Sequence, residues 1–136
     1  TAGGGGGGGG TPVTTKVDDS AGVYGTGWTS VSETPLYGGT SHQCKVTTCQ
    51  VTYTFTGTGV SWIGQKDANY GQASVYLDNV LVATANAYNA SNVYQQTLYS
   101  VSNLTAGSHT LKIVPTGTHT TGTDNWIEVD AFTFTS

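Results

Sequence analysis

The side chains able to perform acid–base or nucleophilic chemistry are few in this chain, and they are scattered. Asp and Glu together total eight and His three in 136 residues. Glycoside hydrolysis needs two carboxyl groups that face one cleft. The candidates for such a pair, Asp67, Asp124 and Glu128, adjoin no recognisable acid–base motif. The histidines have no Gly-x-Ser-x-Gly nucleophile motif beside them. We therefore expect no enzymatic activity from this chain.

Cys44 and Cys49 are the two cysteines, and they enclose only four residues. A pair without further cysteines or a histidine cluster is a poor set of metal ligands. A disulfide within one hairpin or strand bend explains the pair better, and it would stabilise the fold by roughly 2 kcal/mol. Since disulfides persist in oxidising compartments, the pair predicts a secreted, extracellular protein.

The charge of the chain argues against two kinds of partner. The formal net charge is −4, and the basic residues are four scattered lysines: Lys16, Lys45, Lys66 and Lys112. Nucleic acids and anionic membranes are bound by clustered cations, which are absent from this sequence. No apolar run approaches the roughly 20 residues that span a bilayer. We expect a monomer that binds neither nucleic acid nor membrane.

Eight consecutive glycines, Gly3–Gly10, stand near the start of the chain. Glycine loses more backbone entropy on folding than any other residue, and glycine-rich runs behave as flexible linkers. We therefore predict a glycine-rich linker over residues 1–11 and one folded domain over residues 12–136. A linker in this position indicates an appended module, with a catalytic domain covalently linked upstream.

Apolar residues recur with a period of two along most of the domain. In Gln50–Thr56 the odd positions are apolar and the even ones carry hydroxyl or amide groups, as in a half-buried strand. Asp78-Asn79 separates two apolar runs and is typical of a tight hairpin turn. About nine strands and no helix of two turns predict an antiparallel β-sandwich or jelly roll. The other predicted strands lie at 14–18, around Trp28 and Tyr37, and at 60–64, 74–77, 80–84, 94–101, 108–114 and 126–134.

Five segments, taken in order, resemble the galactose-binding-like β-sandwich modules that are appended to secreted glycoside hydrolases and polysaccharide lyases. They are Val17–Ser20 with Tyr24 and Gly27-Trp28, Tyr53–Gly64, Tyr70–Asp78, Leu104–Leu111 and Val129–Phe134. Carbohydrate-binding modules of families 6 and 35 are relatives in fold. The resemblance implies an all-β jelly roll that binds carbohydrate, although this fold also hosts modules that bind no sugar.

The resemblance further implies a sugar site in the loops at one end of the sandwich, close to the last loop. Pyranose rings stack their apolar faces on aromatic side chains, while amides and carboxylates bind the hydroxyl groups. The chain has three tryptophans and eight tyrosines. The candidate ligand-binding residues are Trp28 in a glycine-flanked loop, Tyr70 beside Gln65 and Asp67, and Asn125 and Trp126 after the polar loop 116–124.

Some of these residues have a structural explanation that competes with the functional one. Trp62 lies in register with Val60 on a predicted strand, so we expect it in the core. Trp28 and Trp126 fit a place in the core as well as a binding platform. His109 follows a turn into a strand, and we expect a structural histidine held by hydrogen bonds.

Modules of families 6 and 35 commonly carry a structural calcium ion held by acidic residues near the first and last strands. By that resemblance Asp18, Asp19 and Asp130 are candidate ligands, since calcium prefers hard oxygen donors. The N-terminal glutamate pattern of those families is absent from this chain. The alternative is that Asp18 and Asp19 are turn residues and that Asp130 caps a neighbouring segment.

The leading hypothesis is a carbohydrate-binding module that targets a carbohydrate-active enzyme to its polysaccharide. With four lysines and no arginine, strong binding of highly sulfated chains is not expected, which leaves neutral or uronic-acid-containing cell-wall glycans. The alternative is a structural spacer or a protein-recognition and adhesion domain. Exposed tryptophans would favour the first hypothesis, and buried tryptophans the second.

Overall fold

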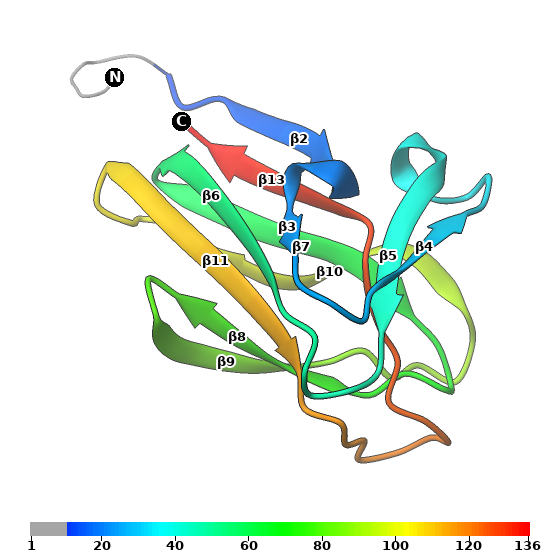
Figure 1. The fold of residues 1–136 in the computed structure, drawn as a ribbon. Coiled ribbons are helices and arrows are strands. Elements are labelled where there is room, and N and C mark those ends of the chain that lie inside the picture. Colours follow the sequence, from blue (N-terminus) through cyan, green and yellow to red (C-terminus); the bar gives the residue numbers. More distant parts are fainter. Residues whose placement is uncertain (1–10) are drawn as a thin grey trace.

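The computed structural model describes residues 11–136, so nearly all of the predicted glycine-rich linker lies outside the described residues. Within that range the strands of each sheet pair antiparallel, as the sequence predicts (Figure 1). No helix among residues 11–136 is both long and apolar enough to cross a membrane. The elements in chain order are β2 (Thr14–Asp18), η1 (Asp19–Ala21), β3 (Val23–Tyr24), β4 (Thr29–Ser32), η2 (Tyr37–Gly39), β5 (Thr40–Cys44), β6 (Val51–Gly57), β7 (Gly59–Lys66), β8 (Gln72–Leu77), β9 (Val80–Asn86), β10 (Val93–Val101), β11 (Gly107–Pro115), β12 (Ile127–Val129) and β13 (Ala131–Thr135).

Two sheets form the layers of the sandwich. One has the order β10-β7-β13-β2 and the other the order β3-β6-β11-β8-β9, while β12, β5 and β4 form a third, smaller sheet. The first and last strands of the described residues, β2 and β13, are therefore neighbours, because β13 lies between β2 and β7 (Figure 1). The fold is the predicted antiparallel β-sandwich.

The core lies between the sheets and is made by alternate residues of the strands. In β6 the side chains of Val51, Tyr53 and Phe55 are buried, whereas Thr54 and Thr56 face solvent. Phe132 of β13 is fully buried and stacks on Tyr53 from the opposite sheet, with ring centroids 4.5 Å apart. Trp62 is fully buried as well, which confirms the predicted core position.

The hairpin between β8 and β9 has the predicted tight turn. Asp78 and Asn79 have φ angles of 51° and 66°, the left-handed pair that a two-residue hairpin turn of the primed type requires. The Asp78 carboxylate lies 2.6 Å from Nδ1 of His109, whose Nε2 faces the carbonyl oxygen of Thr105 at 2.5 Å. These hydrogen bonds raise the pKa of His109 and lower that of Asp78, and they give His109 the expected structural role.

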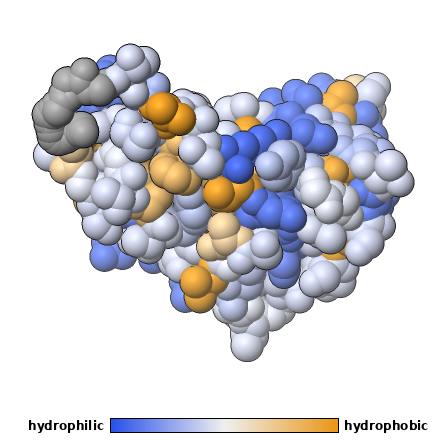
Figure 2. All heavy atoms as spheres, turned by 90° about the horizontal axis from the view of Figure 1, so that it is seen from above, coloured by the Kyte–Doolittle hydropathy of each residue, from blue (hydrophilic) through white to orange (hydrophobic). Residues whose placement is uncertain are grey.

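Strand β9 forms one edge of its sheet and contains a bulge. Val75 pairs with Ala83 but the next residue, Tyr76, pairs with Leu81, so Val82 is an extra residue without a partner on β8. Three successive apolar residues, Val80, Leu81 and Val82, are exposed at this edge. The face seen from above in Figure 2 is mostly polar, with hydrophobic atoms in small separate groups.

Two predicted strands differ from the structure. Tyr37 begins the 3-10 turn η2, in which Gly38 has a φ of 63°, and the strand β5 starts only at Thr40. The predicted strand 126–134 is two strands that belong to different sheets, with Asp130 between them. Both carboxyl oxygens of Asp130 accept a hydrogen bond from the backbone N–H of Tyr37, at 3.0 and 3.1 Å. This contact therefore joins the two places where the structure differs from the predicted strands.

Candidate functional site

Three loops meet at one end of the sandwich, around Tyr70 and Trp126. The two residues form an isolated parallel bridge, in which Gly71 donates its N–H to the Trp126 carbonyl at 3.0 Å. Asp67 accepts the backbone N–H of Asn89 from the neighbouring loop at 3.1 Å. Gly71 permits the close approach, because a Cβ there would lie 2.8 Å from the Cα of Asn125. The structure thus brings Tyr70, Asp67, Asn125 and Trp126 together, as expected for a loop site.

Trp126 is partly exposed, and a lysine lies over its ring. Lys45 Nζ is 4.9 Å from the ring centroid and 3.1 Å from Oδ2 of Asp124. The hydrogen bond from Lys45 lowers the pKa of Asp124. The Asn125 side chain donates to the Gly117 carbonyl at 3.0 Å, and its Oδ1 lies 2.5 Å from Nδ1 of His119. An aromatic ring flanked by an amide, a carboxylate and an imidazole can stack on a sugar and bind its hydroxyl groups.

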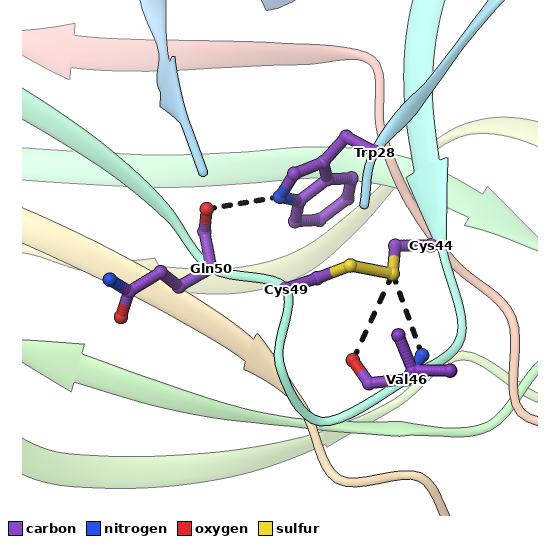
Figure 3. The surroundings of a disulfide bond; sticks show 5 residues. All are labelled: Trp28, Cys44, Val46, Cys49 and Gln50. Atoms are coloured by element: carbon purple, nitrogen blue, oxygen red, sulfur yellow. Dashed lines mark hydrogen bonds between the residues drawn. A yellow bond between two sulfur atoms is a disulfide. The ribbon is translucent and has the colours of Figure 1, made fainter. Parts of the chain in front are cut away.

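Trp28 lies beside the disulfide rather than among the three loops. The bond between Cys44 and Cys49 confirms the predicted pairing, and Trp28 Nε1 donates to the Gln50 carbonyl at 3.0 Å (Figure 3). Gly27 has a φ of 100°, and a Cβ there would lie only 2.7 Å from Cys49 Sγ. Trp28 is half-buried, with its ring packed edge-on against Tyr24. Trp28 therefore lies beside the disulfide loop, and Lys45 of the same loop lies over the Trp126 ring.

Replacing Cys44 and Cys49 by serine is expected to lower the free energy of unfolding by about 2 kcal/mol, because the short closed loop no longer restricts the unfolded chain. Both cysteines are buried, and Gly27 lies against their sulfur atoms. The loss is expected where the native disulfide is intact, under non-reducing conditions at neutral pH. Urea titrations with and without dithiothreitol measure it. The reductant should destabilise the native chain and leave the double variant unchanged; equal midpoints for all four samples would contradict the prediction.

Gln65 and Tyr70 lie beneath this surface, around the buried carboxyl group of Glu128. Tyr70 Oη and Ser41 Oγ each donate to one Glu128 oxygen at 2.5 Å. Because a carboxylate only accepts hydrogen bonds, the Gln65 amide nitrogen faces it, 2.8 and 3.1 Å from its two oxygens. Burial raises the pKa of Glu128, and burial together with the Glu128 charge raises that of Tyr70. Gln65 and Tyr70 are both buried, so the structure does not expose them to a ligand as predicted. Instead they pack beneath the surface formed by the loops.

A chain of polar side chains leads from this buried group to the surface. The Gln65 amide lies 2.5 Å from the Asn92 amide, which is 3.2 Å from Tyr94 Oη, and this oxygen is 3.4 Å from the Glu33 carboxylate. Asn92 and Glu33 are exposed and Tyr94 half-buried. These three residues were not predicted from the sequence. Nothing in the sequence distinguishes Tyr94 from the other seven tyrosines or links it to Glu33, 61 residues away.

The predicted calcium ligands are near one another but are already engaged. Asp19 accepts the Thr40 hydroxyl at 2.7 Å and contacts His42 Nδ1 at 2.6 Å, and Asp18 accepts the Asp19 N–H at 2.8 Å. Burial, with the charges of Glu128 and Asp19, raises the pKa of Asp130 to about 6. Burial and the Asp19 carboxyl group raise the pKa of Asp18. Among residues 11–136, no group of three or more acidic, His or Cys side chains has the geometry of a metal site.

No protein-family model matches the chain. Two enzymes of Flavonifractor plautii are similar in sequence. An A type blood N-acetyl-α-D-galactosamine deacetylase is 40% identical over 105 residues, which cover 76% of this chain and 14% of the enzyme. An A type blood α-D-galactosamine galactosaminidase is 37% identical over 102 residues, or 74% of this chain and 9% of the enzyme. The chain thus spans only a small part of the relatives it matches.

Two solved structures illustrate the likeness in fold. An exo-β-1,3-galactanase from Phanerochaete chrysosporium with galactose superposes with a TM-score of 0.66 at 14% identity, over 91% of this chain and 29% of that one. A family 36 carbohydrate-binding module in complex with calcium and xylotriose gives a TM-score of 0.52 at 18% identity, over 90% of this chain and 99% of that one. The chain has the β-sandwich fold of a carbohydrate-binding module, and its sequence relatives are carbohydrate-active enzymes. A relation to families 6 and 35 stays a prediction.

Proposed function

We propose that this domain is a non-catalytic carbohydrate-binding module that targets a secreted carbohydrate-active enzyme to its glycan. The observation that carries the proposal is the partly exposed Trp126, set among Asn125, Asp124 and His119 where three loops meet. The small share of each relative that the chain matches supports a module attached to a catalytic domain. The disulfide between Cys44 and Cys49 supports secretion.

The glycan is a polysaccharide or oligosaccharide whose terminal or internal ring stacks on Trp126. Neutral and uronic-acid-containing cell-wall glycans remain the classes that the composition predicts. The activities of the two relatives add glycans that carry galactosamine or N-acetylgalactosamine. The neutral, uronic-acid-containing and galactosamine-containing glycans should all be tested in one binding panel.

Replacing Trp126 by alanine is expected to weaken glycan binding at least roughly tenfold, because it removes the stacking surface. The measurement is affinity electrophoresis or calorimetry of the whole chain against that panel. Tyr76→Ala is the matched control, since Lys112 Nζ lies 4.6 Å from the Tyr76 ring much as Lys45 lies over Trp126. Tyr76→Ala should bind like the native chain. A folded native chain that is retained on no glycan would overturn the proposed function.

We also propose that a structural calcium ion binds at Asp18, Asp19 and Asp130. The supporting observation is that burial and neighbouring carboxyl groups raise the pKa values of Asp18 and Asp130: Asp19 acts on Asp18, and Glu128 and Asp19 act on Asp130. A bound cation would relieve this cost of ionisation. Gly38 packs directly against the Asp18 carboxylate, because a Cβ there would lie 2.6 Å from Oδ2. Calcium accepts backbone carbonyls and water besides carboxylates, so these residues need to supply only part of the ligand set.

A protein-recognition role is the second candidate, favoured by the exposed Val80, Leu81 and Val82 on the edge strand β9. It predicts that a folded chain is retained on no glycan and that charged substitutions at these valines and leucine abolish capture by a protein partner. Retention on a glycan that Trp126→Ala abolishes would exclude it as the main function.

A further inference from the structure

The solvent-facing side of the Trp126 ring is covered by the ammonium group of Lys45. The partly buried ring packs against the hydrophobic core. Lys45 Nζ lies 4.9 Å from the ring centroid, and the Lys45 side chain is 44% exposed. Because a charged ammonium stays hydrated rather than enter an apolar core, it lies over the face of the ring that is turned to solvent. A sugar that stacks on Trp126 needs this same face.

The backbone holds Lys45 and Trp126 next to each other. Cys44 pairs with Ile127 across two neighbouring strands, so the next residue along β5, Lys45, comes beside Trp126. The disulfide closes the loop that begins at Lys45 (Figure 3). The carbonyl of Trp126 accepts the N–H of Gly71 at 3.0 Å, which fixes the other partner. Lys45 can therefore leave the ring by rotating its own side chain, without a movement of the backbone.

The contacts that hold the Lys45 side chain over the ring are individually weak. Lys45 Nζ is 3.1 Å from Oδ2 of Asp124, whose other oxygen accepts the backbone N–H of Asn125 at 2.9 Å. The side chains of Lys45 and Asp124 are 44% and 35% exposed. An ion pair at such exposure contributes little, and a cation over an exposed aromatic ring contributes a similarly small amount. A ligand can replace these contacts, but their loss reduces its affinity.

We infer that Lys45 competes with the sugar for the solvent-facing side of Trp126 and so lowers the affinity of the module for neutral glycans. A neutral sugar has to displace the ammonium before it can stack, and it offers no negative charge to the displaced cation. The competition for the sugar rests on the proposed function. The position of Lys45 over the ring does not, so the two can be tested separately.

The first test needs no sugar, because it measures how easily acrylamide quenches the fluorescence of Trp126. In a Trp28→Phe background the remaining tryptophans are Trp126 and the fully buried Trp62. Adding Lys45→Ala should increase the quenching, since it uncovers the ring. Lys112→Ala is the matched control, because it removes the same charge from over another ring, that of Tyr76, at 4.6 Å. Equal quenching with and without Lys45→Ala would overturn the inference.

The second test is calorimetric titration of the whole chain with the methyl α-glycosides of D-galactose and N-acetyl-D-galactosamine and with the neutral polysaccharides of the panel. Lys45→Ala should bind the neutral glycans that the native chain binds roughly three- to tenfold more tightly. Raising the salt concentration from about 0.05 M to about 1 M should tighten binding by the native chain and not by Lys45→Ala, because salt screens exposed charges. Lys112→Ala should behave like the native chain.

A gain in affinity cannot result from partial unfolding, so this outcome would support the competition directly. Unchanged or weaker binding by Lys45→Ala would overturn the inference and leave the proposed function standing. If neither the native chain nor Lys45→Ala is retained on any glycan, the proposed function is wrong, and with it the competition for a sugar. The quenching comparison would then still decide whether Lys45 covers Trp126.

Discussion

Replacing Phe132 by alanine is expected to lower the free energy of unfolding by about 3 to 5 kcal/mol, the usual cost of a large cavity in a packed core. Phe132 is fully buried on β13, the strand between β2 and β7, and its ring stacks on Tyr53 of the opposite sheet. The substitution therefore removes contacts between the two layers at their centre, where no solvent can fill the space.

Urea titration followed by tryptophan fluorescence measures this loss. Phe134→Ala is the matched control, because Phe134 lies two residues along the same strand and is only half-buried. The Phe134→Ala substitution should lower the free energy of unfolding clearly less than Phe132→Ala does. Equal losses at the two positions would mean that Phe132 is not the inner contact between the sheets.

Replacing Asp130 by asparagine is expected to stabilise the domain at neutral pH in the absence of calcium. The folded-state pKa of Asp130 is raised to about 6 from its ordinary 3.8, so the folded chain holds this proton more tightly than the unfolded chain. At pH values above the folded-state pKa, the ionised carboxyl group therefore lowers the free energy of unfolding by on the order of 3 kcal/mol. This loss disappears as the pH falls toward the ordinary pKa of the group. Asparagine carries no charge and keeps an oxygen for the Tyr37 N–H.

The measurement is the urea midpoint of both chains at about pH 7 and about pH 4, with EDTA. The variant should be more stable at the higher pH, and the difference should vanish at the lower one. Asp78→Asn is a control of opposite sign, because His109 lowers the pKa of Asp78 and its ionised form stabilises the fold. That variant should lose stability at neutral pH.

Calcium adds a second comparison with the same two chains. Millimolar calcium should raise the urea midpoint of the native chain at neutral pH and have little effect on Asp130→Asn. An unchanged native midpoint would contradict the proposed calcium site. The pH dependence of the Asp130 substitution would still be expected, since it follows from burial of the carboxyl group.

The sequence was sufficient to predict the fold because its local patterns agree with one another. The period of two in Val51–Phe55 identifies the buried face of β6, and Asp78-Asn79 adopts the turn that its backbone tolerance predicts. Cys44 and Cys49 are close enough along the chain that their pairing needs no knowledge of the fold. Each of these features depends on residues within a few positions of one another.

The features that the sequence did not reveal all depend on contacts between distant segments. The pattern of 126–134 reads as one strand, because the N–H that Asp130 accepts belongs to Tyr37, 93 residues away. Likewise, nothing before the fold is known brings Lys45 to Asp124, although the two are only 3.1 Å apart. The candidate loop site was predicted through resemblance, whereas the path from Glu128 to Glu33 exists only once several strands and loops have packed together.

The bulge in β9 has a consequence for how the protein behaves at high concentration. An edge strand with three exposed apolar residues would, if it were straight, offer a template on which further molecules add strand by strand into fibrils. The extra residue Val82 interrupts the hydrogen-bonding repeat and twists the strand, so the ladder cannot continue in register. Val80, Leu81 and Val82 can therefore stay exposed at the edge of the sheet without offering a regular template to a further strand.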